Sequence, residues 1–491
     1  YAVDEALAAI RPEIDNIRSA WTTAVVHGDL DRLAACAGAL RYLYLMLGLW
    51  EEGGQWLAEA ACAIAHRQAT EGSRPIEQML ADVLMELAEL HSTCGDHTQL
   101  AAVARRLVHL GRLGSYPRAR AAGHLALAKA YLGQSRLARA DRHLQLALCL
   151  AQQVGEAEME ADVLAVLGGA AHFQGEKARA QRLLEQALAR YRQLGRRLEE
   201  ANTLSSLSHV YHNDPAKVHR WTTQRLRLAQ RVGSSVDELR ALHRLTILWL
   251  NVGEYAQTRD CCLCALRLGE RMNDAFNPTH FLDFLGLAYH YLGDDITALR
   301  YLQQTADLCK AAGDPRALAY ALHWSGQVLL ARGEYSNAAD SYAQAVDIRL
   351  LHHQPHLALQ SQAGLARVRI AQGRTAHALA LVDPIVAQLA ALRQQDVEDP
   401  SMLWLNCYWV LWANNDRRAE AVLVEAHDIV QERAGRISDP AMRRTFLHNI
   451  AVHRQIIDAW QSLGAPKIHP APALLDPHRS NDFGRLYHLS D

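Results

Sequence analysis

Residues 281–302 read FLDFLGLAYHYLGDDITALRYL, and residues 321–342 read ALHWSGQVLLARGEYSNAADSY. The two stretches lie 40 residues apart, and Gly293 and Gly333 within them fall in register with Gly253 and Gly373. The fifth residue after each glycine is small and the ninth is bulkier: Thr258, Ala298, Ala338 and Ala378, then Cys262, Leu302, Tyr342 and Val382. A recurrence of this length indicates an array of structural repeats, each packed mainly against its neighbours.

Each repeat is predicted to be a pair of helices joined at the glycine. In the repeat around Gly293 the first helix carries Leu282, Leu285, Gly286 and Tyr289 at helical spacing, and the second carries Ala298, Leu302 and Thr305 on one stripe. The small Gly286 lets the paired helix come close. These units resemble tetratricopeptide repeats of a longer kind. We therefore predict an all-α fold, a right-handed superhelical solenoid of tetratricopeptide-like helix pairs with a period of about 40 residues.

The breaks in the helical pattern, most of them at glycine or proline, predict four regions along the chain. Residues 1–115 form an N-terminal helical arm of atypical repeats, and residues 116–435 form the regular array, with one degenerate second helix near Asn213. Residues 436–464 hold a capping helix, a single one over 440–463, and residues 465–491 form an irregular tail with four prolines. The chain begins at Tyr1, without Met and within a helical pattern, which suggests a fragment of a longer protein.

Composition points to a cytoplasmic helical protein. Half of the 491 residues are apolar, and the net charge of −2 gives no global footprint for nucleic acid or for an anionic membrane. The nine cysteines are scattered through helical patterns, as expected of reduced thiols. No apolar run reaches the roughly 18 residues of a membrane span. We therefore expect neither direct nucleic-acid binding nor membrane insertion.

Candidate catalytic and metal motifs are weak. Cys261 and Cys264 form a lone CxxC, whereas a structural zinc site needs four ligands. His209 and His212 lie three residues apart, but no HExxH motif accompanies them, and the cluster of His352, His353 and His356 sits at a turn. The chain contains no phosphate-binding GxxxxGK[ST] loop and no GxSxG elbow. We expect no cofactor, no metal and no enzymatic activity within this chain.

The concave groove lined by the first helices is the expected ligand site. By tetratricopeptide geometry its polar and aromatic positions include His209, His212, Arg240, His243, Asn251, His280, Asp283, His290, Tyr291, Tyr320, His323, Gln327 and Arg367. Their mixed charge favours hydrogen bonding and stacking with a partly polar ligand over capture of a simple acidic peptide. The competing interpretation is an ordinary solvated groove, whose residues are polar in any case.

Two segments carry a resemblance to a known family. Residues 13–29 read EIDNIRSAWTTAVVHGD and residues 48–57 read GLWEEGGQWL, and both resemble the region that follows the winged helix in bacterial STAND signal-transduction ATPases, the MalT-like and AfsR-like regulators. Residues 439–460 resemble the helix that closes such arrays. The resemblance implies an ATPase module in cis, N-terminal to this chain, an arm over 1–115, a sensor over 116–464, and oligomerisation of the parent protein on activation.

Three functions remain open on the sequence. The first is a ligand-sensing regulatory module that binds a small-molecule or protein inducer and relieves autoinhibition, with His243, His290, Tyr291, Tyr320 and His323 as the central contacts. The second is a constitutive scaffold that binds a peptide or helix in the same groove. The third is a repeat-based enzyme or metal protein. A small inducer needs a pocket concentrated in two or three repeats, whereas a protein partner uses a stripe along many.

Overall fold

The chain is built from helices only, as far as it is described. The computed structural model describes residues 3–113, 116–270, 277–393 and 400–464, and none of these residues forms a β-strand. The all-α repeat architecture predicted from the 40-residue period is therefore confirmed. No helix in the described part is long and apolar enough to cross a membrane.

The helices fall into two compact units, which are described separately. The N-terminal unit contains the described residues up to Tyr211 together with Gln224–Ser235. Its helices are α1 (Val3–Ile10), η1 (Arg11–Glu13), α2 (Ile14–His27), α3 (Leu30–Leu47), α4 (Trp50–Glu71), α5 (Arg74–Cys94), α6 (His97–Leu113), α7 (Pro117–Gly133), α8 (Leu137–Val154), α9 (Ala157–Phe173), α10 (Lys177–Leu194) and α11 (Arg197–Val210). Residues of α12 (Pro215–Val232) belong to both units.

The C-terminal unit contains His212–Thr223 and the described residues from Val236 onward. Its helices are α13 (Ser235–Val252), α14 (Tyr255–Gly269), α15 (Thr279–Tyr291), α16 (Asp295–Ala312), α17 (Pro315–Ala331), α18 (Tyr335–Leu351), α19 (Pro355–Ala371), α20 (Thr375–Val386), α21 (Leu389–Leu392), α22 (Pro400–Ala413), α23 (Arg418–Gly435), α24 (Pro440–His448), α25 (Ala451–Gln461) and η3 (Ser462–Gly464). We refer to α24 and α25 together as the cap.

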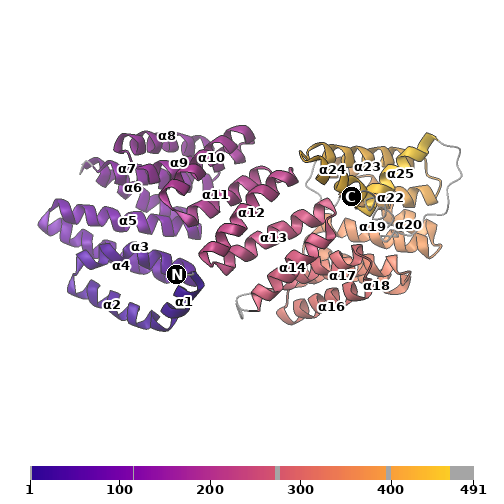
Figure 1. Ribbon diagram of the computed structural model, residues 1–491, viewed down its shortest axis with the longest axis horizontal. Helices are drawn as coiled ribbons and strands as arrows, with labels where there is room; N and C mark the ends of the chain where they lie inside the picture. The colour runs from indigo at the N-terminus through magenta and orange to yellow at the C-terminus, as the bar shows by residue number, and fades with distance from the viewer. Residues whose placement is uncertain (1–2, 114–115, 271–276, 394–399, 465–491) are drawn as a thin grey trace, which may run out of the picture. The chain divides into compact units, whose positions relative to one another are not determined.

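Consecutive helices pack as hairpins, and the first helix of each pair also contacts the first helix of the next. Such contacts join α5 to α7, α7 to α9, α15 to α17 and α17 to α19. Figure 1 shows the resulting succession of hairpins within each unit. A single hairpin leaves one apolar face uncovered, so stacking on the neighbouring hairpin is what buries it.

The glycines that set the period end the first helices. Gly293 adopts a left-handed φ of 96°, and the next amide, that of Asp294, donates to the Tyr289 carbonyl at 2.9 Å. The Asp294 side chain then accepts the Thr297 amide at 3.0 Å and so caps α16. Because a left-handed φ strains any side chain with a Cβ, glycine recurs where this sharp turn is needed.

The contact surface between paired helices explains the other recurring positions. A Cβ built on Gly286 would lie 2.8 Å from Cγ of Leu302, and one built on Gly326 would lie 2.9 Å from the Tyr342 ring. Leu302 and Tyr342 are buried, as are the alanines that precede them by one turn. The small-to-large pattern thus lets two helix backbones approach closely, as the sequence predicted.

Two predicted elements differ from the structure. The cap is not a single helix over 440–463: it breaks at Asn449–Ile450, where Ile450 takes an extended ψ of 112° as the N-cap of α25. The segment after Asn213, expected to be a degenerate second helix, forms the full helix α12, because Pro215 occupies the first turn, where a missing amide is tolerated. The break in the cap bears directly on the candidate site.

Candidate functional site

A cavity of about 260 Å³ lies inside the C-terminal unit. The first helices α13, α15, α17 and α19 contribute to its lining, and so do α22, α23 and the cap. Its apolar and aromatic lining consists of Ile247, Leu250, Phe284, Leu287, Trp324, Met402, Leu403, Phe446 and Ile450. The polar lining consists of Asn251, Tyr255, Tyr291, Tyr320, His323, Gln327, Arg349, Gln360, Arg433 and His453.

The cap closes this cavity by reaching back to the start of the unit. The Ser438 hydroxyl, just before α24, hydrogen bonds to Oδ1 of Asp214 at 2.9 Å across 224 residues of sequence. At the break between the cap helices, Ile450 lies so close to Gly253 that a Cβ on that glycine would be 3.0 Å from Cγ1 of Ile450. The last and first helices of the C-terminal unit therefore meet, and the cavity lies between them.

His453 fixes α25 to the start of α22. Its Nδ1 lies 2.8 Å from the Phe446 carbonyl, which can only accept, so Nδ1 carries the proton. Nε2 of the neutral ring then accepts the Ser401 hydroxyl proton at 3.1 Å. Burial, reinforced by the nearby Arg433 charge, lowers the pKa of His453 to about 4. The ring is therefore neutral near pH 7; its Nδ1 joins the two cap helices to each other, and its Nε2 joins the cap to α22.

Arg349, Ser361 and His323 form a second polar group beside the cavity. Nη1 of Arg349 donates to the Leu357 carbonyl at 2.7 Å and to Oγ of Ser361 at 2.6 Å. The same Oγ lies 2.9 Å from Nδ1 of His323. Burial, followed by the Arg349 charge, lowers the pKa of His323 to about 3. His323 is half-buried because part of its surface faces the cavity, and its ring is neutral at pH 7.

Aromatic contacts order the rest of the lining. Tyr255 stacks on Tyr291 with ring centroids 4.5 Å apart, and Nε2 of Gln327 donates to the Tyr291 hydroxyl at 2.8 Å. Tyr320 lies 5.4 Å from the Trp324 ring and also lies under the Arg349 guanidinium, 5.1 Å from its centroid. These contacts hold large side chains in fixed orientations, which lowers the entropy lost when a ligand binds.

Of the predicted groove residues, five line the cavity: Asn251, Tyr291, Tyr320, His323 and Gln327. Three others are buried away from its lining. Nδ1 of His290 is held by Oδ1 of Asp295 at 2.6 Å. Burial raises the pKa of Asp283 well above its usual value, and burial lowers the pKa of Arg367 to about 10.

The remaining predicted residues lie outside the cavity lining. His243 is half-buried and contacts the His280 and Phe281 rings at centroid distances of 5.9 and 5.7 Å. His280 is exposed, and so is Arg240, which lies 3.6 Å from Asp237. His209 and His212 are exposed and fall in different units.

Gln360 lies at a position that tetratricopeptide geometry assigns to the groove, whereas sequence reasoning missed Arg349, Trp324, Arg433 and His453 as cavity residues. Arg349 lies on a second helix, where the repeat pattern predicts packing, and a charged residue at the helical spacing of Ala338, Tyr342 and Ala345 was the only available signal. His453 enters the site because the cap turns back over the unit, and Arg433 contributes from the end of α23, just before the cap. No spacing along the sequence encodes that return.

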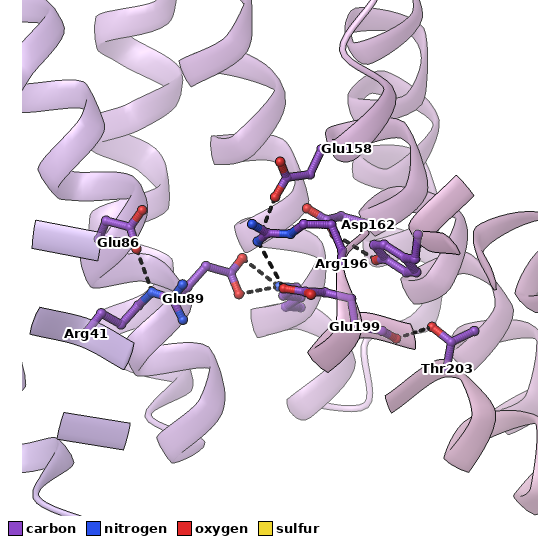
Figure 2. A network of polar contacts seen from close by, with 10 residues as sticks. Arg41, Glu86, Glu89, Glu158, Asp162, Arg196, Glu199 and Thr203 are labelled. Carbon is purple, nitrogen blue, oxygen red and sulfur yellow. Dashed lines mark hydrogen bonds and ion pairs between the residues drawn. The ribbon is translucent and has the colours of Figure 1, made fainter. Parts of the chain in front are cut away.

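The N-terminal unit carries a different polar arrangement, shown in Figure 2. Ion pairs link successive first helices: Arg41 to Glu86 at 2.5 Å, and Lys129 to Glu89 at 2.7 Å. Arg196, at the start of α11, lies 2.8 Å from Glu158 on α9. Each charge in this ladder has an opposite charge on the neighbouring repeat, so the ladder stabilises stacking and does not expose an unbalanced charge to a ligand.

Burial also raises the pKa of Asp162 to about 6, although this carboxylate accepts the Tyr191 hydroxyl at 2.7 Å. Asp162 lies on α9 and Tyr191 on α10, and a pKa of about 6 means that this carboxylate is ionised at neutral pH but takes up a proton just below it.

Thiols and metal-ligating side chains do not assemble into a site in the described part of the chain. No group of three or more His, Cys, Asp or Glu side chains there is placed to hold a metal ion. Burial raises the pKa of the Cys261 thiol to about 11 and that of Cys262 to about 12. Both thiols are protonated near pH 7, and Cys262 occupies the packing position of Leu302 and Tyr342 in the neighbouring repeats.

No protein-family model matches this chain, and no curated protein matches it. Several solved structures have a similar helical arrangement. A STAND protein with a tetratricopeptide repeat sensor from Pyrococcus horikoshii is 13% identical, with a TM-score of 0.49, over 66% of this chain and 54% of that protein. This chain therefore spans about half the length of that protein.

Two further structures resemble the chain over most of their own length. A Rap protein complexed with competence and sporulation factor is 12% identical over 78% of this chain and 98% of that one, with a TM-score of 0.40. The apo form of RapI is 10% identical over 87% of this chain and 99% of that one, with a TM-score of 0.43. At identities this low, the similarity is one of helical fold alone.

Proposed function

We propose that this chain is the ligand-sensing module of a STAND-type ATPase, and that its inducer binds in the cavity of the C-terminal unit. The observation that carries the proposal is a cavity enclosed between the first helices and the cap, lined by ordered aromatic and polar side chains. Pockets of this kind are the usual sites for small ligands. On this proposal the chain binds its ligand without transforming it, acts in the cytoplasm, and passes the signal to an ATPase module in cis.

A sensor needs two states, and in this proposal they are a closed and an open position of the cap. A ligand that touches both Tyr320 on α17 and Phe446 on the cap makes its full contacts only when the cap is closed. Ligand binding therefore stabilises the closed state by RT ln(1 + [L]/Kd), and only this differential affinity shifts the equilibrium. The Ser438–Asp214 contact and the Gly253–Ile450 contact are the places where opening would begin.

The alternative is a constitutive scaffold that binds a helix or peptide in the same groove. The cavity volume of about 260 Å³ is close to the roughly 300 Å³ at the lower end of the range for small-molecule pockets. A helical partner would therefore have to displace the cap, or to use exposed positions such as Arg240 and His280. The volume favours a small ligand in this site.

The test is native mass spectrometry of the purified chain and of a variant whose cavity is filled. Leu287→Trp adds bulk at a lining position, and Leu292→Trp makes the same change at an exposed position one turn beyond. We expect a bound mass that is released on denaturation from the wild type and from Leu292→Trp, and that is absent from Leu287→Trp. Equal occupancy in both variants would place the ligand elsewhere, and the assignment of the cavity would then be wrong.

A further inference from the structure

The charge of the cavity lining has one sign only. Among the described residues that line it there is no Asp and no Glu, whereas Arg349 and Arg433 both contribute to it. An arginine stays protonated at any physiological pH. The two histidines add no charge near pH 7, because burial holds the pKa of His323 at about 3 and that of His453 at about 4. The cavity lining thus carries positive charge, and its described residues carry no negative charge.

Arg433 is the cation best placed to act on a ligand. No described carboxylate lies within ion-pair distance of it, and the neighbouring Glu432 pairs with Arg393 at 2.6 Å. Its guanidinium lies 5.8 Å from the centroid of the Phe446 ring, so an aromatic face supports it on one side. Its side chain is half-buried, and an anionic ligand in the cavity would supply the counter-charge that the described residues do not provide.

Gln360 supplies an independent indication. Gln360 lines the same cavity, and its Nε2 is buried and has no hydrogen-bond acceptor among the described residues. A buried donor left without an acceptor is destabilising. A ligand oxygen in the cavity would satisfy it. The lining therefore offers cationic and neutral donors, and it lacks any carboxylate that would repel an anion.

The rest of the lining indicates the chemical character of the uncharged part of the ligand. Phe284, Trp324 and Leu287 present apolar surface, so a bare inorganic anion would leave most of the cavity uncovered. A volume of about 260 Å³ lies near the lower end of the range for small-molecule pockets, roughly 300–1,000 Å³. That size suits a compact molecule with one anionic group and one ring or branched chain.

We propose that the cavity of the C-terminal unit binds a small organic anion, with Arg433 and the Gln360 amide contacting its charged group and the aromatic lining contacting its apolar body. This inference rests on the proposed function, since it names the chemical class of that ligand. Carboxylates and phosphate monoesters share the chemistry that Arg433 recognises, and the experiment separates the two.

The experiment measures binding of defined probes to the full chain by calorimetry, with thermal unfolding in parallel. The probes are phenylacetate, phenyl phosphate, the uncharged phenylacetamide, and inorganic phosphate alone. We expect one of the two aromatic anions to bind and to raise the unfolding temperature, and phenylacetamide and inorganic phosphate to bind at least ten-fold more weakly. Which aromatic anion binds more tightly identifies the charged group.

Two variants test whether Arg433 contacts the anion. Arg433→Gln should weaken binding of the preferred anion by roughly ten- to hundred-fold, as loss of a hydrogen bond to a charged group does. Arg436→Gln removes an exposed arginine one turn on and should leave the affinity unchanged. Equal affinity for phenylacetamide, or no effect of Arg433→Gln, would overturn the anion assignment, and so would the failure of both aromatic anions to bind.

Failure of the anion inference and failure of the proposed function give different results. If the uncharged probe binds and Leu287→Trp abolishes that binding, the cavity is a ligand site but not one for anions. If a probe binds equally to the wild type and to Leu287→Trp, the cavity itself is not the site.

Discussion

Acidification should destabilise the C-terminal unit through two neutral histidines. The folded unit holds the pKa of His323 at about 3 and that of His453 at about 4, both below the ordinary value of 6.5. Between these values the unfolded chain binds more protons than the folded one, so stability rises with pH there. The stabilisation is complete above pH 6.5 and is lost as the pH falls toward 4 and then 3.

The magnitude follows from the linkage relation. One pKa unit corresponds to 1.36 kcal/mol, so a change from pH 7.5 to pH 5.5 removes about 1.3 kcal/mol for each histidine and roughly 2.5 kcal/mol for the two. Asp283 in the same unit has the opposite effect, because burial raises its pKa and its neutral form is favoured in the fold. The prediction is therefore made for a difference between two proteins, in which the contribution of Asp283 cancels.

The assay compares the wild type with a His323→Gln, His453→Gln double variant in urea at pH 7.5 and pH 5.5. A brief deuterium pulse, followed by mass spectrometry of peptides from α17 and α25, reports unfolding of the C-terminal unit alone. The wild type should lose roughly 2.5 kcal/mol more than the variant on acidification. An equal loss in both proteins would refute the assignment of neutral histidines, and a larger loss in the variant would reverse its sign.

Three further outcomes are expected. Gly286→Leu should lower the stability of the C-terminal unit by about 1–3 kcal/mol, because even a Cβ would lie 2.8 Å from the facing leucine, whereas Gly169→Ala, which meets no atom within 4 Å, should be neutral or mildly stabilising in thermal unfolding. Asp214→Ala should remove the hydrogen bond to Ser438 before α24 and speed hydrogen exchange in the cap. Unchanged exchange there would show that this contact does not hold the cap closed. In the native protein at pH 8, iodoacetamide should label the exposed Cys62 and leave Cys407 unmodified, because burial raises the pKa of the Cys407 thiol to about 12.

The sequence by itself determined the helical array, because the information that builds a helix pair is local. A glycine at Gly293 ends one helix, Asp294 begins the next, and Gly286 faces Leu302 sixteen residues later. All of these contacts fall within one period, so a 40-residue pattern displays them directly. The same locality explains why Cys262, which takes the place of Leu302 and Tyr342 in its repeat, is buried.

Only the tertiary structure decided the candidate site. His290 and His323 were both predicted groove residues on the first helices of neighbouring repeats, yet His290 is held by Asp295 from its own repeat while His323 borders the cavity. His453 joins the lining because the chain breaks at Ile450 and returns to Gly253, nearly two hundred residues earlier, and Arg433 adds to it from α23. A repeat pattern records what each residue does within its own helix pair, whereas this cavity depends on where the first and last helices of the C-terminal unit meet.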